Sequence, residues 1–91
     1  MEDSELNSYY SGIKKKHPRA DLRLIHKILR HVKENTGGNN QPKSIPTREI
    51  CNSFLEIKQS KLKTCLKYLC EDKNLKMHEM GKDYSFSQKK R

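Results

Sequence analysis

Residues 54–75 carry the clearest pattern in the chain and read FLEIKQSKLKTCLKYLCEDKNL. From Ser60 onward the apolar residues recur three and four positions apart, as they do on the buried face of a helix. They are Leu62, Cys65, Leu66 and Leu69. Lysine occupies several of the positions between them. The pattern therefore predicts a helix over about 60–72 with one buried face and one basic face.

The same helical spacing occurs upstream, in the residues that follow Pro18 and Asp21. Both residues suit a first helical turn, because proline lacks the N–H that would be unpaired there and an acid is favoured near a helix N-terminus. We expect a helix over about 18–35 that ends before the glycine- and asparagine-rich loop at 36–42. Its apolar positions are Leu22, Leu24, Ile25, Ile28, Leu29 and Val32.

Between these two helices the sequence predicts a short strand at Ile45 and a short second helix. Thr47 is a residue type that often caps a helix N-terminus. The apolar residues that follow it share one helical face, and they are Ile50, Cys51, Phe54 and Leu55. The helix that begins near Ser60 is therefore the third of this set.

After Asn74 the apolar period changes from 3.6 to 2. Residues 75–80 and 84–87 alternate in polarity, and Gly81, Lys82 and Asp83 separate them. Two alternating runs joined by a glycine-containing turn indicate a β-hairpin. The sequence thus predicts a small α+β fold, with three helices, a short strand after the first and a C-terminal hairpin.

The predicted domain covers residues 18–87. Residues 1–17 are polar, show no sustained apolar period and contain the flexible pair Ser11-Gly12, so we expect a flexible N-terminal arm. Residues 88–91 end in three basic side chains and are expected to form a basic tail.

The charge of the chain points to a polyanionic partner. Among 91 residues, 20 Lys and Arg stand against 11 Asp and Glu, a formal charge of +9. Four of the basic and three of the acidic residues lie in the first 20 positions, so residues 21–91 carry +8. A folded surface with that surplus repels itself unless a polyanion offsets it, and nucleic acid is the commonest such partner.

Composition also excludes several classes of protein. A length of 91 residues favours a single domain, and no stretch approaches the roughly 20 apolar residues of a membrane-spanning helix, so no membrane partner is expected. The acidic residues near the N-terminus do not fit a secretory signal. Three irregularly spaced cysteines do not form an even disulfide framework, which favours an intracellular, reducing compartment such as the cytoplasm, nucleoid or nucleus.

The expected order of elements, together with residues 54–75, resembles the winged helix-turn-helix superfamily. An apolar residue stands in the turn (Ile57), and an apolar triplet, Leu62, Leu66 and Leu69, lies where it would bury the recognition helix. Asn74 stands where a left-handed residue leads into the first wing strand, and asparagine tolerates that backbone region. The chain departs from the pattern at the turn, where glycine is common but absent, and in its short wing.

The resemblance implies that the third helix enters the major groove of double-stranded DNA. Lysine can donate to guanine, glutamine can pair with adenine, and the methyl group of threonine can contact thymine. The candidate contacts on the turn and the third helix are Lys58, Gln59, Ser60, Lys61, Lys63, Thr64 and Lys67. Thr47 and Arg48 are candidate contacts to the backbone, and Lys82 is a candidate contact to the minor groove or the backbone. Salt-dependent affinity would be added by the last three residues and by Lys14, Lys15, Lys16 and Arg19.

The sequence predicts a binding protein rather than an enzyme, without a cofactor. It contains no nucleophile with an evident base, no glycine-rich phosphate loop and no paired carboxylates in an apolar setting. The cysteines and histidines lack the spacing of a zinc site, since Cys65 and Cys70 are five positions apart on a helix. Cys51 and Cys65 fall on apolar faces and are expected to be small core residues.

Three alternatives remain open at this point. The domain can serve as a protein–protein module within a larger nucleic-acid complex, because fold alone does not assign function. It can bind single-stranded nucleic acid or RNA, with Tyr68 or Tyr84 stacked on bases. A homodimer that contacts two half-sites is also compatible with the sequence. Within the DNA-binding hypothesis, roles in transcriptional regulation and in replication or partition use the same surface.

Overall fold

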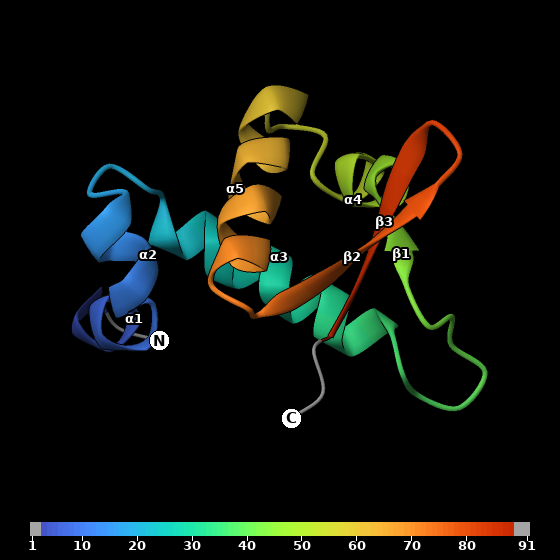
Figure 1. Ribbon diagram of the computed structural model, residues 1–91, viewed down its shortest axis with the longest axis horizontal. Helices are drawn as coiled ribbons and strands as arrows, with labels where there is room; N and C mark the ends of the chain where they lie inside the picture. Colours follow the sequence, from blue (N-terminus) through green and yellow to red (C-terminus); the bar gives the residue numbers. More distant parts are fainter. Residues whose placement is uncertain (1–2, 89–91) are drawn as a thin grey trace.

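The computed structural model describes residues 3–88 as an α+β fold of five helices and a three-stranded sheet. The helices are α1 (Asp3–Tyr9), α2 (Ser11–Lys16), α3 (Leu22–Asn35), α4 (Thr47–Ser53) and α5 (Gln59–Glu71). The strands are β1 (Ile45–Pro46), β2 (Leu75–Met80) and β3 (Asp83–Gln88). All strand pairs are antiparallel and the sheet order is β1-β3-β2. In Figure 1, α5 lies between the α1–α2 pair and the β2–β3 hairpin.

Helix α3 is central because its apolar face contacts α1, α5 and β3. The residues of that face are buried, as the periodicity predicts, and they are Leu22, Leu24, Ile25, Ile28, Leu29 and Val32. The helix begins at Leu22 rather than at residue 18. The side chain of Asp21 explains this start, because its Oδ1 accepts a hydrogen bond from the Leu24 N–H at 3.2 Å and so caps the helix.

The N-terminal segment corrects the expectation of a flexible arm over residues 1–17. Its described part forms α1 and α2, which gives five helices instead of three. Leu6, Tyr10 and Ile13 are only 3%, 0% and 2% exposed and belong to the core. They are four and three positions apart, which is one helical face, but this short pattern is hidden among polar residues.

Two contacts fix the N-terminal helices to the rest of the domain. The Tyr10 hydroxyl lies 2.9 Å from His26 Nδ1 on α3. Helix α2 approaches the end of α5 so closely that a Cβ at Gly12 would lie 2.5 Å from a carboxylate oxygen of Asp72. A larger residue at position 12 would therefore require the Asp72 carboxylate to move.

The predicted hairpin and the short strand at Ile45 are both confirmed. Met80 pairs with Asp83, so a two-residue turn of Gly81 and Lys82 joins β2 to β3. Gly81 has φ +63°, while Lys82 does not have a positive φ. Turns with a positive φ at the first central residue suit the twist of a hairpin and favour glycine there.

The left-handed residue before β2 is Lys73 (φ +61°), not Asn74 as predicted. The N–H of Lys73 donates to the Cys70 carbonyl and that of Asn74 donates to the Leu69 carbonyl. This pair of hydrogen bonds is the Schellman motif, which places the left-handed residue directly after the C-cap Asp72.

The predicted basic tail, residues 88–91, is described only at its first residue. Gln88, expected in the basic tail, belongs to β3, and its amide donates to the carbonyls of Lys33 and Thr36 at the end of α3. The rest of the predicted tail, residues 89–91, lies outside the described residues. Within residues 3–88 no helix has the length and apolar character needed to cross a membrane.

The contact between Tyr10 and His26 gives a first prediction. Tyr10→Phe removes only the hydroxyl, and we expect the free energy of unfolding to fall by about 1 kcal/mol, a typical net value for one hydrogen bond. Tyr10→Ala also removes a buried ring and should cost about 3–5 kcal/mol. Urea denaturation measures both. Equal stability of all three proteins would show that α1 and α2 do not belong to the cooperative fold.

His26 gives a second prediction, for pH. Burial and, after it, the charge of Arg30 lower the pKa of His26, so the folded protein takes up this proton less readily than the unfolded chain. The corresponding stability is complete above about pH 6.5, the ordinary histidine pKa, and is lost as the pH falls below it. Between pH 7 and pH 5 the urea midpoint of the wild type should therefore decrease more than that of His26→Asn. Parallel pH profiles would contradict this assignment.

Candidate nucleic-acid interface

Helix α5 presents the basic face that its sequence predicts. Its other face is buried, with Leu62, Cys65, Leu66 and Leu69 in the core. Burial raises the pKa of the Cys65 thiol to about 11, so this side chain stays neutral, as a core residue does. Lys58 is the N-cap, and Gln59 and Ser60 open the helix. The exposed side chains on α5 include Gln59, Ser60, Lys61, Lys63, Thr64 and Lys67.

The lysines of α5 lie on two different flanks of the helix. Lys61 and Lys63 are two residues apart, which corresponds to about 200° around a helix axis. Each flank borders a cleft, and the two clefts are similar in size, about 490 and 480 Å³. The three lysines of α5 are thus divided between two surfaces, while the predicted contacts Lys58 and Arg48 line neither cleft.

The first surface, the hairpin cleft, lies between α5 and the β2–β3 hairpin. Its lining includes three lysines and two acidic residues together with Thr47, Met77 and Tyr84; the charged residues are Lys63, Lys67, Lys82, Glu71 and Asp83. Lys63 and Lys67 reach it from α5, Lys82 from the hairpin turn and Thr47 from α4, so the fold brings together four predicted contacts from three elements. The side chains of Met77 and Tyr84 are about half exposed. The hairpin cleft therefore has partly apolar walls, and its charged lining consists of three lysines and two carboxylates, a small positive excess.

The second surface, the N-terminal cleft, lies between α5 and the segment that joins α2 to α3. Its lining includes Lys16, Arg19, Asp21, Lys61, Thr64 and Tyr68. The sequence contains no signal that the segment around Lys16 would lie beside the third helix. The packing of α1 and α2 into the core places it there.

Lys61 already has an acidic partner in the N-terminal cleft. Its Nζ lies 3.3 Å from Asp21 Oδ2, while Asp21 Oδ1 caps α3. Partial burial alone would raise the pKa of Asp21, but the N–H of Leu24 and the ammonium of Lys61 together hold it below its ordinary value. Both side chains are about half exposed, so the ion pair is weak and Lys61 can exchange partners at little cost.

Thr47 is placed differently from the prediction. The N-cap of α4 is Pro46, and Thr47 is the first helical residue with only 6% of its surface exposed. Its hydroxyl donates to the Tyr84 carbonyl at 2.9 Å. Thr47 therefore joins α4 to β3, and its hydroxyl is not available as an N-cap. The neighbouring Arg48 is exposed, as is Lys82 in the hairpin turn.

The hydroxyl of Thr64 is also engaged locally, because it donates to the Ser60 carbonyl at 2.9 Å. In a helix this hydrogen bond is common for threonine. The hydroxyl donor of Thr64 is therefore already in use, although the residue is exposed.

Tyr68 is covered on one face by His17. The two rings stack with centroids 3.9 Å apart and an interplanar angle of 19°, and His17 Nε2 lies 3.3 Å from Glu71 Oε2. One of the two ring faces that single-strand binding could use at Tyr68 is therefore occupied by a side chain of the same protein. His17 was not expected at the interface, because nothing in the sequence links it to the third helix. Tyr84 is 44% exposed.

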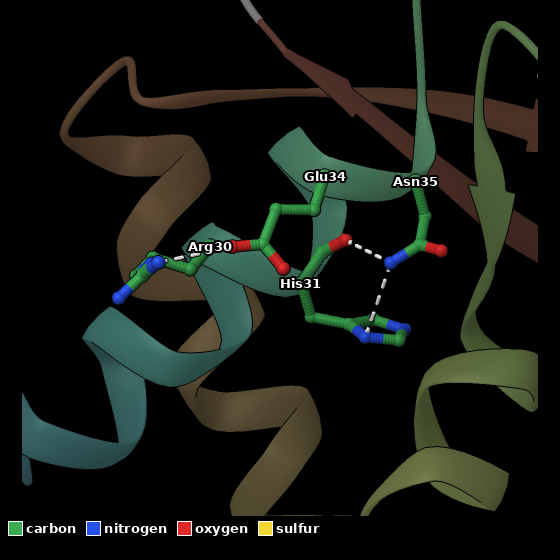
Figure 2. Close-up of polar contacts among 4 residues, drawn as sticks. All are labelled: Arg30, His31, Glu34 and Asn35. Carbon is green, nitrogen blue, oxygen red and sulfur yellow. Dashed lines mark hydrogen bonds and ion pairs between the residues drawn. The ribbon is translucent and has the colours of Figure 1, made fainter. Parts of the chain in front are cut away.

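The outer face of α3 contrasts with these clefts, because its polar groups satisfy one another (Figure 2). Arg30 and Glu34 form an ion pair at 3.1 Å, and Asn35 Nδ2 donates to the His31 carbonyl at 2.7 Å. This face also carries Lys27 and Lys33, which are exposed and line neither cleft. These two lysines are suitable controls for charge changes in the clefts.

The described residues contain no group of three or more His, Cys, Asp and Glu side chains that could hold a metal ion. Comparisons with known proteins add no relative: no family model matches the chain, and no significant match was found among curated proteins or solved structures. The geometry and charge of the two clefts are therefore the observations that bear on function.

Asp21 gives a prediction that separates its two contacts. Asp21→Ala removes the cap of α3 and the ion pair, and should lower the free energy of unfolding by about 1 kcal/mol. Asp21→Asn keeps a good capping group and loses only a half-exposed ion pair, so its cost should be clearly smaller. Thermal denaturation at pH 7 compares them. Equal losses in both variants would show that the side chain does not act mainly as a cap.

Proposed function

We propose that this chain is a winged helix-turn-helix domain that binds double-stranded DNA, with α5 in the major groove. The order α3-β1-α4-α5-β2-β3 and the sheet order β1-β3-β2 support this assignment, since the hairpin then stands as a wing beside the third helix of the set. Helices α1 and α2 are an addition to that arrangement. The short turn of Gly81 and Lys82 makes the wing small.

The hairpin cleft is the observation that carries the proposal. Lys63 and Lys67 on α5 and Lys82 on the hairpin turn come from separate elements, yet they line one surface. A helix with its side chains is about 10–12 Å wide, which matches the major groove of about 12 Å. With α5 in the groove, a DNA strand would pass along the hairpin cleft, and the three ammonium groups would neutralise its phosphates.

The other exposed residues of α5 have separate roles in this proposal. Gln59 and Ser60, in the first turn, would approach base edges, where glutamine can pair with adenine. The methyl group of Thr64 would face the groove, where it can contact thymine. Arg48, at the start of α4, would contact the backbone. A domain with this surface would act in transcriptional regulation or in DNA replication or partition.

The decisive experiment is a salt titration of binding to a fluorescently labelled 20-base-pair duplex of random sequence. The wild type should lose affinity steeply with salt, with a slope of log K against log salt of about 0.9 per phosphate contacted. Lys63→Glu with Lys67→Glu should weaken binding at least tenfold, because it replaces attraction by repulsion at the same cleft. Since both side chains are exposed, stability should change by only about 0.5 kcal/mol for each substitution.

Lys27→Glu with Lys33→Glu is the matched control, because it changes the net charge equally on a face that borders neither cleft. The control should retain most of the wild-type affinity. If both double variants weaken binding equally, the attraction is only a property of the net charge. If the wild type does not bind duplex DNA at 50 mM salt, the proposal is wrong and the basic face serves a protein partner.

A further inference from the structure

We infer that the N-terminal cleft is a second contact surface for the DNA backbone, so that the domain holds both strands that border the major groove. This inference rests on the proposed function and extends it to a part of the chain outside the winged-helix elements. The segment around Lys16 and Arg19 then acts as a fixed counterpart of the hairpin on the opposite flank of α5.

The N-terminal segment carries a concentrated positive charge. No acidic residue occurs between Leu6 and Ala20, whereas the basic residues of this stretch stand within six positions. They are Lys14, Lys15, Lys16 and Arg19, and all four side chains are exposed. Lys14 Nζ donates to the Pro18 carbonyl at 3.0 Å, which leaves Lys16 and Arg19 as the basic side chains that line the cleft from this segment.

The segment also has a fixed position beside α5, whereas a flexible arm would not form a defined surface. Ile13 is buried in the core, Gly12 packs on Asp72, and His17 stacks on Tyr68 of α5. These three contacts lie within six residues and hold the segment against the side of α5 that faces away from the hairpin. In Figure 1, α2 and the hairpin accordingly lie on opposite sides of α5.

The acid in the cleft does not oppose an anion strongly. Asp21 uses one carboxylate oxygen to cap α3 and the other to pair with Lys61. Its charge is therefore balanced by the positive end of the helix dipole and by an ammonium group. Lys16 and Arg19 then contribute an unbalanced positive charge, and Lys61 can turn from Asp21 to a phosphate because its ion pair is half exposed.

The major groove of DNA is bordered by two strands, which matches the two clefts beside α5. A helix that fills the major groove has one DNA strand along each flank. The hairpin cleft borders one flank with Lys63, Lys67 and Lys82, and the N-terminal cleft borders the other with Lys16, Arg19 and Lys61. The two clefts together match two phosphate backbones rather than one.

Lys16→Gln with Arg19→Gln tests this inference in the full chain, by the same salt titration on the random 20-base-pair duplex. Each phosphate contact that is lost should lower the salt slope by about 0.9 and the affinity at 0.1 M salt by roughly eightfold. Lys27→Gln with Lys33→Gln removes the same charge from the outer face of α3 and should leave the slope nearly unchanged. Circular dichroism and thermal denaturation verify that both variants are folded.

The outcomes separate this inference from the proposed function. A reduced slope in Lys16→Gln with Arg19→Gln, but not in the control pair, supports the second surface. Equal slopes in the two variants, with normal duplex binding by the wild type, overturn the second surface and leave the hairpin cleft intact. Absence of duplex binding by the wild type overturns the proposed function and this inference together.

Discussion

The packing of α3 is the constraint on which the rest of the structure depends. Only 32% of the residues are apolar, so a domain of this size has few groups to bury. Ile25, Ile28 and Val32 are fully buried, and α1, α5 and β3 all contact their helix. Burial of one such side chain contributes about 1.5–3 kcal/mol, so several elements depend on the same few residues. Because the apolar face of α5 is needed for this core, its polar face is directed outward.

The parts of the fold that could be predicted from the sequence are those with long, regular patterns. Six apolar residues on one face identify α3, and alternation on both sides of Gly81 identifies the hairpin. The N-terminal helices could not be recognised, because Leu6, Tyr10 and Ile13 form only one short face within a polar segment. Their helices have seven and six residues and are too short to be stable alone, so tertiary packing decides whether they form.

The ends of the elements were harder to predict than the elements themselves, because several neighbouring residues have suitable chemistry. Pro18 and Asp21 can both begin a helix, and the carboxylate of Asp21 determines the actual start of α3. Asn74 tolerates a left-handed backbone better than lysine does, yet the end of α5 places Lys73 at that position. Thr47 has a capping side chain, but its hydroxyl finds a partner on β3. Local hydrogen bonds at the helix ends decide the first two positions, and a contact with a distant strand decides the third.

The candidate interface, too, could be predicted from the sequence only in part. The sequence identifies which residues of α5 are basic and exposed, because the helical period locates the buried apolar face and therefore also the exposed face. The sequence does not show that Lys61 and Lys63 lie in different surroundings. Lys61 lies beside Asp21, which caps α3, whereas Lys63 lies beside the hairpin. A net charge of +9 therefore says only that a polyanion is attracted. The six Lys and Arg side chains that line the two clefts lie on opposite flanks of α5. This arrangement fits the proposed duplex partner better than a single strand, because a duplex groove presents two backbones and a single strand has one.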